Sequence, residues 1–141
     1  MSKREEIASR IVETLKTVRA VKTVTREPRA LTELSKTAFP HVLVESANEA
    51  RDISSFGETV RHVADIDFLI NCVVKGRDRD QQRNNVLEAI ETALQADATL
   101  EGLVFDSYVT QIQIREIEEA DPYATAAMIY TVRYYYDRGQ P

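Results

Sequence analysis

The sequence lacks the residues on which many common kinds of site depend. Cys72 is its single cysteine and His41 and His62 are its two histidines, so we expect neither an internal disulfide nor a zinc site built from these side chains. Its four glycines form no glycine-rich phosphate-binding loop, and no serine stands in a G-x-S-x-G motif. These absences argue against the familiar nucleotide-dependent and serine-dependent enzymes.

Long apolar runs and an excess of positive charge are missing as well. No stretch approaches the ~18 apolar residues of a membrane-spanning helix, and the charged start, MSKREEIASR, lacks the apolar segment of an export signal. The net charge is −5, without the basic stripe that nucleic-acid-binding proteins usually carry. We therefore expect synthesis in the cytoplasm and no specific binding of DNA, although an acidic surface is compatible with DNA passing close by.

The remaining pattern predicts a single α+β domain. The chain has 141 residues, 43% of them hydrophobic, which is enough for one core. A capping box from Ser2 to Glu5 and an apolar stripe predict a helix over 3–18, and a second helix, capped by Asp78 or Asp80, is expected over 81–96. Alternating, β-branched segments predict strands over 21–27, 41–46, 62–76, 108–118 and 124–136. We expect a two-layer sandwich, with a mainly antiparallel sheet of about five strands and both helices on one face. Residues 137–141 are expected to form a frayed tail.

The second face of this sheet carries apolar side chains that we expect another part of the chain or another molecule to shield from water. On the last expected strand, one side is apolar throughout, and the other carries Ala127, Ile129 and Tyr135, interrupted by Thr131 and Arg133. Two helices can cover only one face, and a wet antiparallel face would alternate cleanly to polar residues. We interpret the half-apolar face as a surface for self-association. The alternative is that a loop over 47–60, which contains Ile53 and Phe56, folds across it.

Asp65 and Asp67 form a D-x-D pair on one side of the expected strand 62–76. Two carboxylates so spaced can share a divalent metal, which makes a metal-dependent nuclease or transferase an alternative function. Such a site needs a third acidic or histidine ligand that nothing nearby in the sequence supplies, so we favour a solvated strand face. Cys72 lies in register with the apolar side of this strand and is interpreted as a small buried side chain. We expect no catalytic residue, no metal and no cofactor.

The stretch DATLEGLVFDS, residues 97–107, is too apolar for an ordinary loop. It follows the expected second helix and precedes the C-terminal pair of strands. We interpret it as a connector in which Leu100 and Leu103 tuck under the helix, while Gly102 allows a tight reversal of the chain.

The order of these features resembles the tail terminator proteins of long-tailed bacteriophages, also called minor tail or tail completion proteins. The resemblance rests on the helix IASRIVETLKTV, the segment FPHVLVES, the long strand DIDFLINCVVKG and the second helix RNNVLEAIETALQAD. It continues through TLEGLV at 99–104 to TAAMIYTVRYYYD, and so spans residues 7–136.

This resemblance implies a structural subunit of the virion neck that forms a ring, commonly a hexamer, without catalysis or cofactor. Such a ring caps the head-proximal end of the tail tube, stops tube polymerisation and joins the tail to the head connector, while DNA passes through its centre. The implied partners are further copies of the chain, the tail tube protein and a connector or stopper. A head–tail stopper or connector of similar size is an alternative, as is an adaptor that binds a peptide at a sheet edge.

Two groups of residues are expected to serve such a ring. The interface is predicted from apolar residues on the second face and in the loop, and from a segment of mixed charge that can pair across a subunit boundary. These interface residues are Ile53, Phe56, Lys75, Arg77, Arg79, Ile129 and Tyr135. An acidic cluster at the hairpin tip is either simply solvated or faces the lumen and repels DNA phosphates. It comprises Glu116, Glu118, Glu119 and Asp121.

Overall fold

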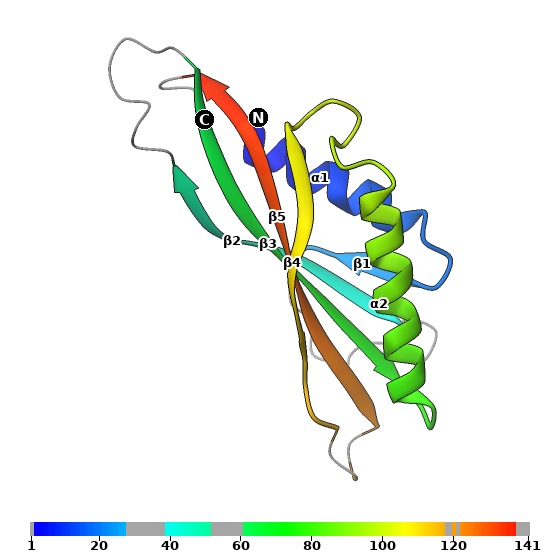
Figure 1. Cartoon of the computed structure of the whole chain (residues 1–141). Coiled ribbons are helices and arrows are strands. Elements are labelled where there is room, and N and C mark those ends of the chain that lie inside the picture. Colours follow the sequence, from blue (N-terminus) through cyan, green and yellow to red (C-terminus); the bar gives the residue numbers. More distant parts are fainter. Residues whose placement is uncertain (1, 28–38, 52–60, 118–119, 121, 138–141) are drawn as a thin grey trace.

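The computed structural model describes residues 2–27, 39–51, 61–117, 120 and 122–137. It is a two-layer α+β sandwich in which two helices pack on one face of a five-stranded sheet, so the predicted fold class is confirmed (Figure 1). In chain order, the elements are α1 (Lys3–Lys16), β1 (Thr23–Thr25), β2 (His41–Arg51), β3 (Arg61–Lys75), α2 (Arg79–Gln95), β4 (Asp106–Ile114) and β5 (Tyr123–Asp137).

The strands lie in the order β1-β2-β3-β5-β4. β1 runs parallel to β2, and the other three neighbouring pairs are antiparallel. The two central strands, β3 and β5, each have 15 residues and pair along their whole length. β1 is shorter than the predicted strand 21–27. β4 begins two residues earlier and ends four residues earlier than the predicted strand 108–118.

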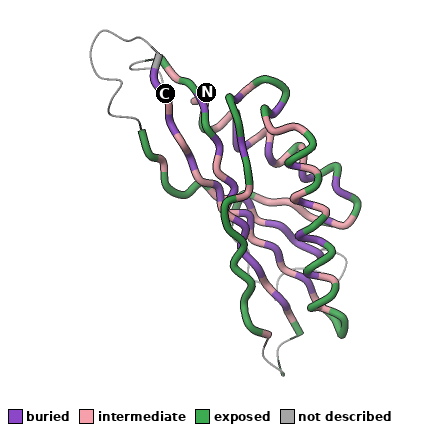
Figure 2. Tube along the Cα trace, in the orientation of Figure 1, coloured by how far each residue is buried: buried purple, intermediate pink, exposed green. Residues whose placement is uncertain are grey.

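Alternation along β3 and β5 decides which side chains form the core. The even-numbered residues from Ala64 to Val74, and from Ala124 to Tyr134, face the helices and are buried (Figure 2). Each large apolar side chain buried here stabilises the fold by about 1.5–3 kcal/mol relative to exposure. The helices supply the opposite wall of this core, with Ile7, Ile11 and Leu15 from α1 and Val86, Ile90 and Leu94 from α2.

The two helix starts differ in how they are capped. The Ser2 hydroxyl accepts a hydrogen bond of 3.2 Å from the backbone N–H of Glu5, as the capping box predicts. Asp78 occupies the N-cap position of α2, but its side chain makes no capping hydrogen bond. Of the two predicted caps, Asp78 is therefore the N-cap by position, whereas the Asp80 carboxylate accepts a hydrogen bond of 2.9 Å from Arg83.

β2 is longer than the sequence predicts. Residues 47–51, expected to begin a loop, continue the strand beyond a bulge between Ser46 and Glu49. The bulge breaks the regular alternation, which explains why the segment shows no clean period. It also turns Glu49 toward the helix side, where its carboxylate accepts a hydrogen bond from the Tyr134 hydroxyl and one of 3.0 Å from Arg51. Residues 52–60 of the expected loop lie outside the described residues.

A buried guanidinium fixes α2 to the turn end of the β4–β5 hairpin. Arg83 is only 3% exposed and donates hydrogen bonds to the backbone carbonyls of Arg115, at 2.9 Å, and Thr125, at 3.1 Å. The Asp80 carboxylate balances its charge. Nothing in the local sequence singles out Arg83 as a buried residue, because the two carbonyls that it contacts lie 32 and 42 positions away along the chain.

The segment between α2 and β4 is the connector that the sequence predicts. Leu100, Glu101 and Gly102 have positive φ angles of 50°, 60° and 83°, which reverse the chain within a few residues. The Asp97 carboxylate accepts a hydrogen bond of 2.6 Å from the Glu101 N–H and so holds the turn. Leu100 is buried in the core, and Leu103 packs against the core's edge. The chain reversal at Gly102 and the burial of Leu100 that the sequence predicts are therefore present.

We expect Gly102→Val to lower the free energy of unfolding by about 1–2 kcal/mol, because an L-residue is strained at this positive φ. A Cβ at Gly102 would meet no atom within 4 Å, so the cost arises from the backbone and not from a clash. Urea denaturation measures the change. Gly102→Asn is the matched control and should cost less, since asparagine tolerates left-handed backbone. Equal stability of the valine variant and the unaltered chain would contradict this role for the glycine.

Candidate interaction surface on the open face of the sheet

The sheet face opposite the helices, called the open face below, carries the odd-numbered residues of β3 and β5. On β3 these side chains, from Val63 to Lys75, are half-buried, and no helix of the described chain packs on them. On β5 the face carries Ala127, Ile129 and Tyr135, as the alternation predicts. The half-apolar second face inferred from the sequence is therefore present.

Polar groups on the open face are partnered across the strands. The Asp65 carboxylate accepts two hydrogen bonds from the Arg133 guanidinium, at 2.9 and 3.1 Å, and this pairing raises the pKa of Arg133. Asp67 accepts a hydrogen bond of 2.7 Å from the Thr131 hydroxyl. These are cross-strand pairs of the kind that fix sheet register, since Asp65 lies opposite Arg133 and Asp67 lies opposite Thr131.

This pairing bears on the metal-site alternative. Asp65 neutralises an arginine, and Asp67 is hydrogen-bonded to a hydroxyl, so neither carboxylate is arranged with the other around a common point. Across the described parts of the chain, no group of three His, Cys, Asp or Glu side chains could hold a metal ion. The geometry gives the nuclease alternative no support.

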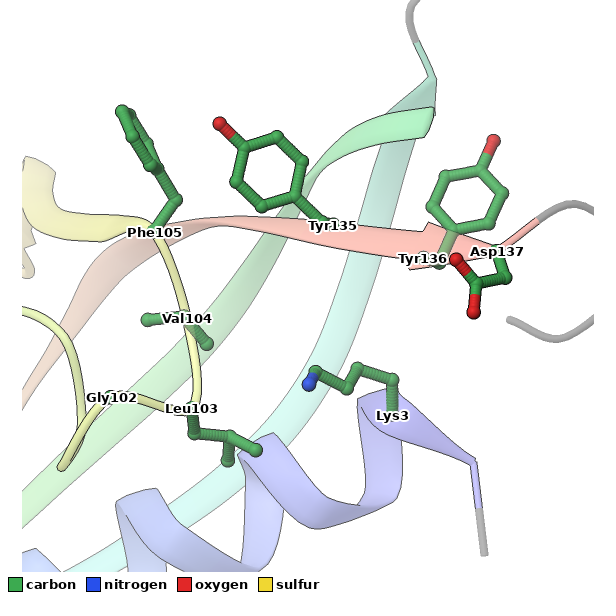
Figure 3. A pocket seen from close by; sticks show the side chains of 8 residues that line it. All are labelled: Lys3, Gly102, Leu103, Val104, Phe105, Tyr135, Tyr136 and Asp137. Carbon is green, nitrogen blue, oxygen red and sulfur yellow. The ribbon is translucent and has the colours of Figure 1, made fainter. Parts of the chain in front are cut away.

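Two aromatic rings stand out at one end of the open face. Phe105, just before β4, is 53% exposed, and Tyr135 of β5 is 40% exposed. Their ring centroids lie 5.5 Å apart at an interplanar angle of 70°, which is a favourable edge-to-face contact. Figure 3 shows both rings projecting from the sheet on the side away from α1. We call this pair the aromatic ridge.

The aromatic ridge separates two grooves, because Phe105 and Tyr135 line both. One groove, with a volume of about 570 Å³, runs toward the connector and Lys3 of α1 (Figure 3). The other, of about 440 Å³, lies on the open face beside the Asp65–Arg133 ion pair. Exposed aromatic side chains beside hollows are characteristic of the anchor positions in protein–protein interfaces.

The predicted interface residues are not gathered in one place. Ile129 lies at the middle of the open face, and Tyr135 lies near one end. Lys75 lies at the other end, where its ammonium is 5.4 Å from the centroid of the Tyr123 ring. Arg77 is exposed in the turn before α2, and Arg79 donates a hydrogen bond of 3.4 Å to the backbone carbonyl of Gly76. Among the described members of this set, Ile129 and Tyr135 therefore share the apolar part of the face.

Several predicted residues cannot be placed. Ile53 and Phe56 of the interface, and Glu118, Glu119 and Asp121 of the acidic tip, lie outside the described residues. Glu116 is exposed just beyond the end of β4.

Phe105 is the residue of this surface that sequence reasoning missed. It belongs to the connector that is too apolar for a loop, which was a usable signal. The sequence could not show that Phe105 meets Tyr135, because the two residues are 30 positions apart along the chain and meet only through β4–β5 pairing.

Cys72 points into the core and is fully buried, which confirms its interpretation as a small apolar side chain. Burial raises the pKa of its thiol to about 12, so the reactive thiolate is scarce near neutral pH.

We expect Cys72 in the folded protein to react with a thiol-specific disulfide reagent at least ~100-fold more slowly than in denaturant, because attack requires the core to open. Absorbance of the released chromophore measures both rates. A rapid reaction in native buffer would show that Cys72 is accessible and would contradict this placement.

No helix in the described part of the chain is long and apolar enough to cross a membrane. No protein-family model matches the sequence, and no curated protein matches it. Among solved structures, one whose name carries no functional description has a TM-score of 0.55 and 15% sequence identity, with 94% of each chain covered. Another belongs to the virion of a native gene transfer agent (GTA) particle, with a TM-score of 0.39 and 12% identity over 87% of this chain and 82% of that one. The first likeness describes the fold alone, and the second is too distant to support an argument.

Proposed function

We propose that this chain is a structural virion protein, the tail terminator of a long-tailed phage or of a phage-like particle. Its copies would form a ring, commonly a hexamer, that caps the head-proximal end of the tail tube and meets the head connector. Two arguments support this proposal: the order of sequence features that resembles the tail terminators, and a fold whose open face suits association with other chains. A head–tail stopper or connector, also a structural neck protein, is the nearest alternative.

The observation that carries the proposal is the aromatic ridge on the open face. A solvent-facing side of an antiparallel sheet ordinarily alternates to polar residues. Here Asp65 and Arg133 neutralise each other beside the ridge, so covering this pair costs less desolvation than covering two free charges. Phe105 and Tyr135 would supply the apolar anchors, and the grooves on either side would receive side chains of the neighbour.

The remaining parts of the proposal concern the lumen of the ring. The chain is acidic overall, with a net charge of −5, and Glu116 is exposed at the base of the hairpin tip. With the tip turned inward, its carboxylates would repel DNA phosphates and leave DNA free to slide through without specific binding. No catalytic residue and no cofactor enters this function.

We expect the purified protein, alone or mixed with tail tubes of the same particle, to appear as rings or as caps at one end of each tube. Negative-stain electron microscopy provides the measurement, and tube length in a polymerisation assay provides a second readout. Failure to form rings and to bind tube ends under both conditions would overturn the proposed function.

We expect the double substitution Phe105→Ser with Tyr135→Ser to weaken ring or tube association by more than about tenfold, because each anchor of this kind contributes about 2 kcal/mol. Both side chains are about half exposed, so circular dichroism should report an unchanged fold. The effect is measured as the concentration needed for half-maximal assembly.

Tyr108→Ser provides the matched control for the ridge. Tyr108 is 51% exposed and lies on the open face opposite Thr131, but it lines neither groove beside the ridge. Its loss should leave assembly within a few-fold of the unaltered chain. If the control and the double variant behave alike, the ridge is not the anchor of the interface.

A further inference from the structure

The outer edge of the sheet at β4 is unusually open to pairing. β4 is the last strand in the sheet order, so only one of its edges is paired with β5. Native proteins usually protect such an edge with charge or proline. Residues 107–114, SYVTQIQI, contain neither, although 29% of the whole chain is charged. Asp106 at the start of β4 and a bulge between Val109 and Gln111 protect the first part of the strand, and the strand beyond the bulge is regular and uncharged.

Beyond the bulge, the backbone direction of each residue can be assigned. The N–H of Arg115 donates to the carbonyl of Thr125 on β5, so Arg115 points its backbone groups inward. In an antiparallel pair this direction alternates, so Gln113 also points inward and Ile112 and Ile114 point outward. The outward N–H and C=O groups of these two isoleucines have no partner strand in the described part of the chain and form the outer edge.

The side chains along this edge are exposed and arranged symmetrically. Ile112 is 37% exposed and Ile114 is 56% exposed, and both lie on the helix side of the sheet, opposite Met128 and Ala126. Gln113 lies between them and projects to the open face. The sequence Ile-Gln-Ile is the same read in either direction. A two-fold axis at Gln113 would therefore place Ile112 of one copy opposite Ile114 of the other.

We infer that β4 pairs antiparallel with β4 of a second copy of this chain, with the two-fold axis passing between the Gln113 residues. In this register, the outward groups of Ile112 exchange hydrogen bonds with those of Ile114 in the other copy, and the reverse pair forms by symmetry. Ile112 and Ile114 of both copies then form one apolar cluster on the helix side of the joined sheet. No like charges face each other near the axis, because 111–114 is uncharged.

This pairing goes beyond the proposed function and uses a different surface. The aromatic ridge lies on the open face near the start of β4, whereas the pairing edge lies past the bulge toward its end. A two-fold contact joins two copies, whereas a ring is built from head-to-tail contacts. If rings form normally but Gln113→Cys gives no cross-linked dimer, the β4 pairing is wrong and the proposed function is unaffected.

Site-specific cross-linking tests the register directly. Gln113→Cys places a thiol at a non-hydrogen-bonded position of the new pair, where the two Cα atoms would be about 4.5 Å apart, within the range that a disulfide spans. Gln113 is exposed, and the native Cys72 is buried, so the introduced thiol is the accessible one among the described residues. With oxidised glutathione we expect most of the chain to migrate at twice its 16.0 kDa mass on a non-reducing gel.

Gln111→Cys is the matched control, on the same strand and the same face. Its symmetry mate would lie four residues along the partner strand, at about 13 Å, which is too far for a disulfide. We therefore expect little cross-linked product from it. Absence of cross-linking at 113, or equal cross-linking at 111 and 113, would overturn the proposed pairing.

A charge exchange at the axis provides an independent measurement. Gln113→Lys and Gln113→Glu should each give a monomer by sedimentation equilibrium, because like charges would face each other across the axis, and their equimolar mixture should recover the dimer. Gln95→Lys, an exposed position on α2, should leave the dimer unchanged. The inference would be contradicted if the unaltered chain stayed monomeric at its highest soluble concentration. It would also be contradicted if the single variants remained dimeric.

Discussion

The pairing of β3 with β5 is the constraint on which the rest of the structure depends. Its fifteen-residue register, from Arg61 opposite Asp137 to Lys75 opposite Tyr123, assigns every side chain of both strands to one of two faces. Because side chains alternate along a strand, a shift of one residue would exchange the core with the open face. The cross-strand pairs Asp65–Arg133 and Asp67–Thr131 favour this one register on the side where apolar packing does not specify it.

The two layers contribute differently to the molecule. The helix side holds the core, and two polar groups there have specific partners: Arg83 donates to two backbone carbonyls and to Asp80, and Glu49 accepts from the Tyr134 hydroxyl and Arg51. Most side chains of the open face are half-buried or exposed. Stability therefore resides on one side of the sheet, which leaves the other side free to carry interactions with neighbouring chains.

Sequence patterns predicted the elements that keep a regular period and missed those that do not. The strict alternation of β3 from His62 to Val74 and the capping box at Ser2 were sufficient to predict β3 and α1. The extension of β2 was missed because its bulge breaks the period. On the surface, Ile129 and Tyr135 were found from alternation, whereas Phe105 was not, since its exposure and its contact with Tyr135 depend on how distant segments pack.

The bulge in β4 has a consequence for how this strand could change during evolution. Before the bulge, even-numbered residues such as Tyr108 lie on the open face; after it, odd-numbered residues such as Gln111 and Gln113 do so. The single extra residue, Thr110, changes which numbers fall on each face, but it keeps Ile112 and Ile114 opposite Met128 and Ala126 on the helix side. Loss of the Thr110 codon would therefore remove the bulge and make the outer edge of β4 regular along its whole length, while every other side chain of the strand kept its face.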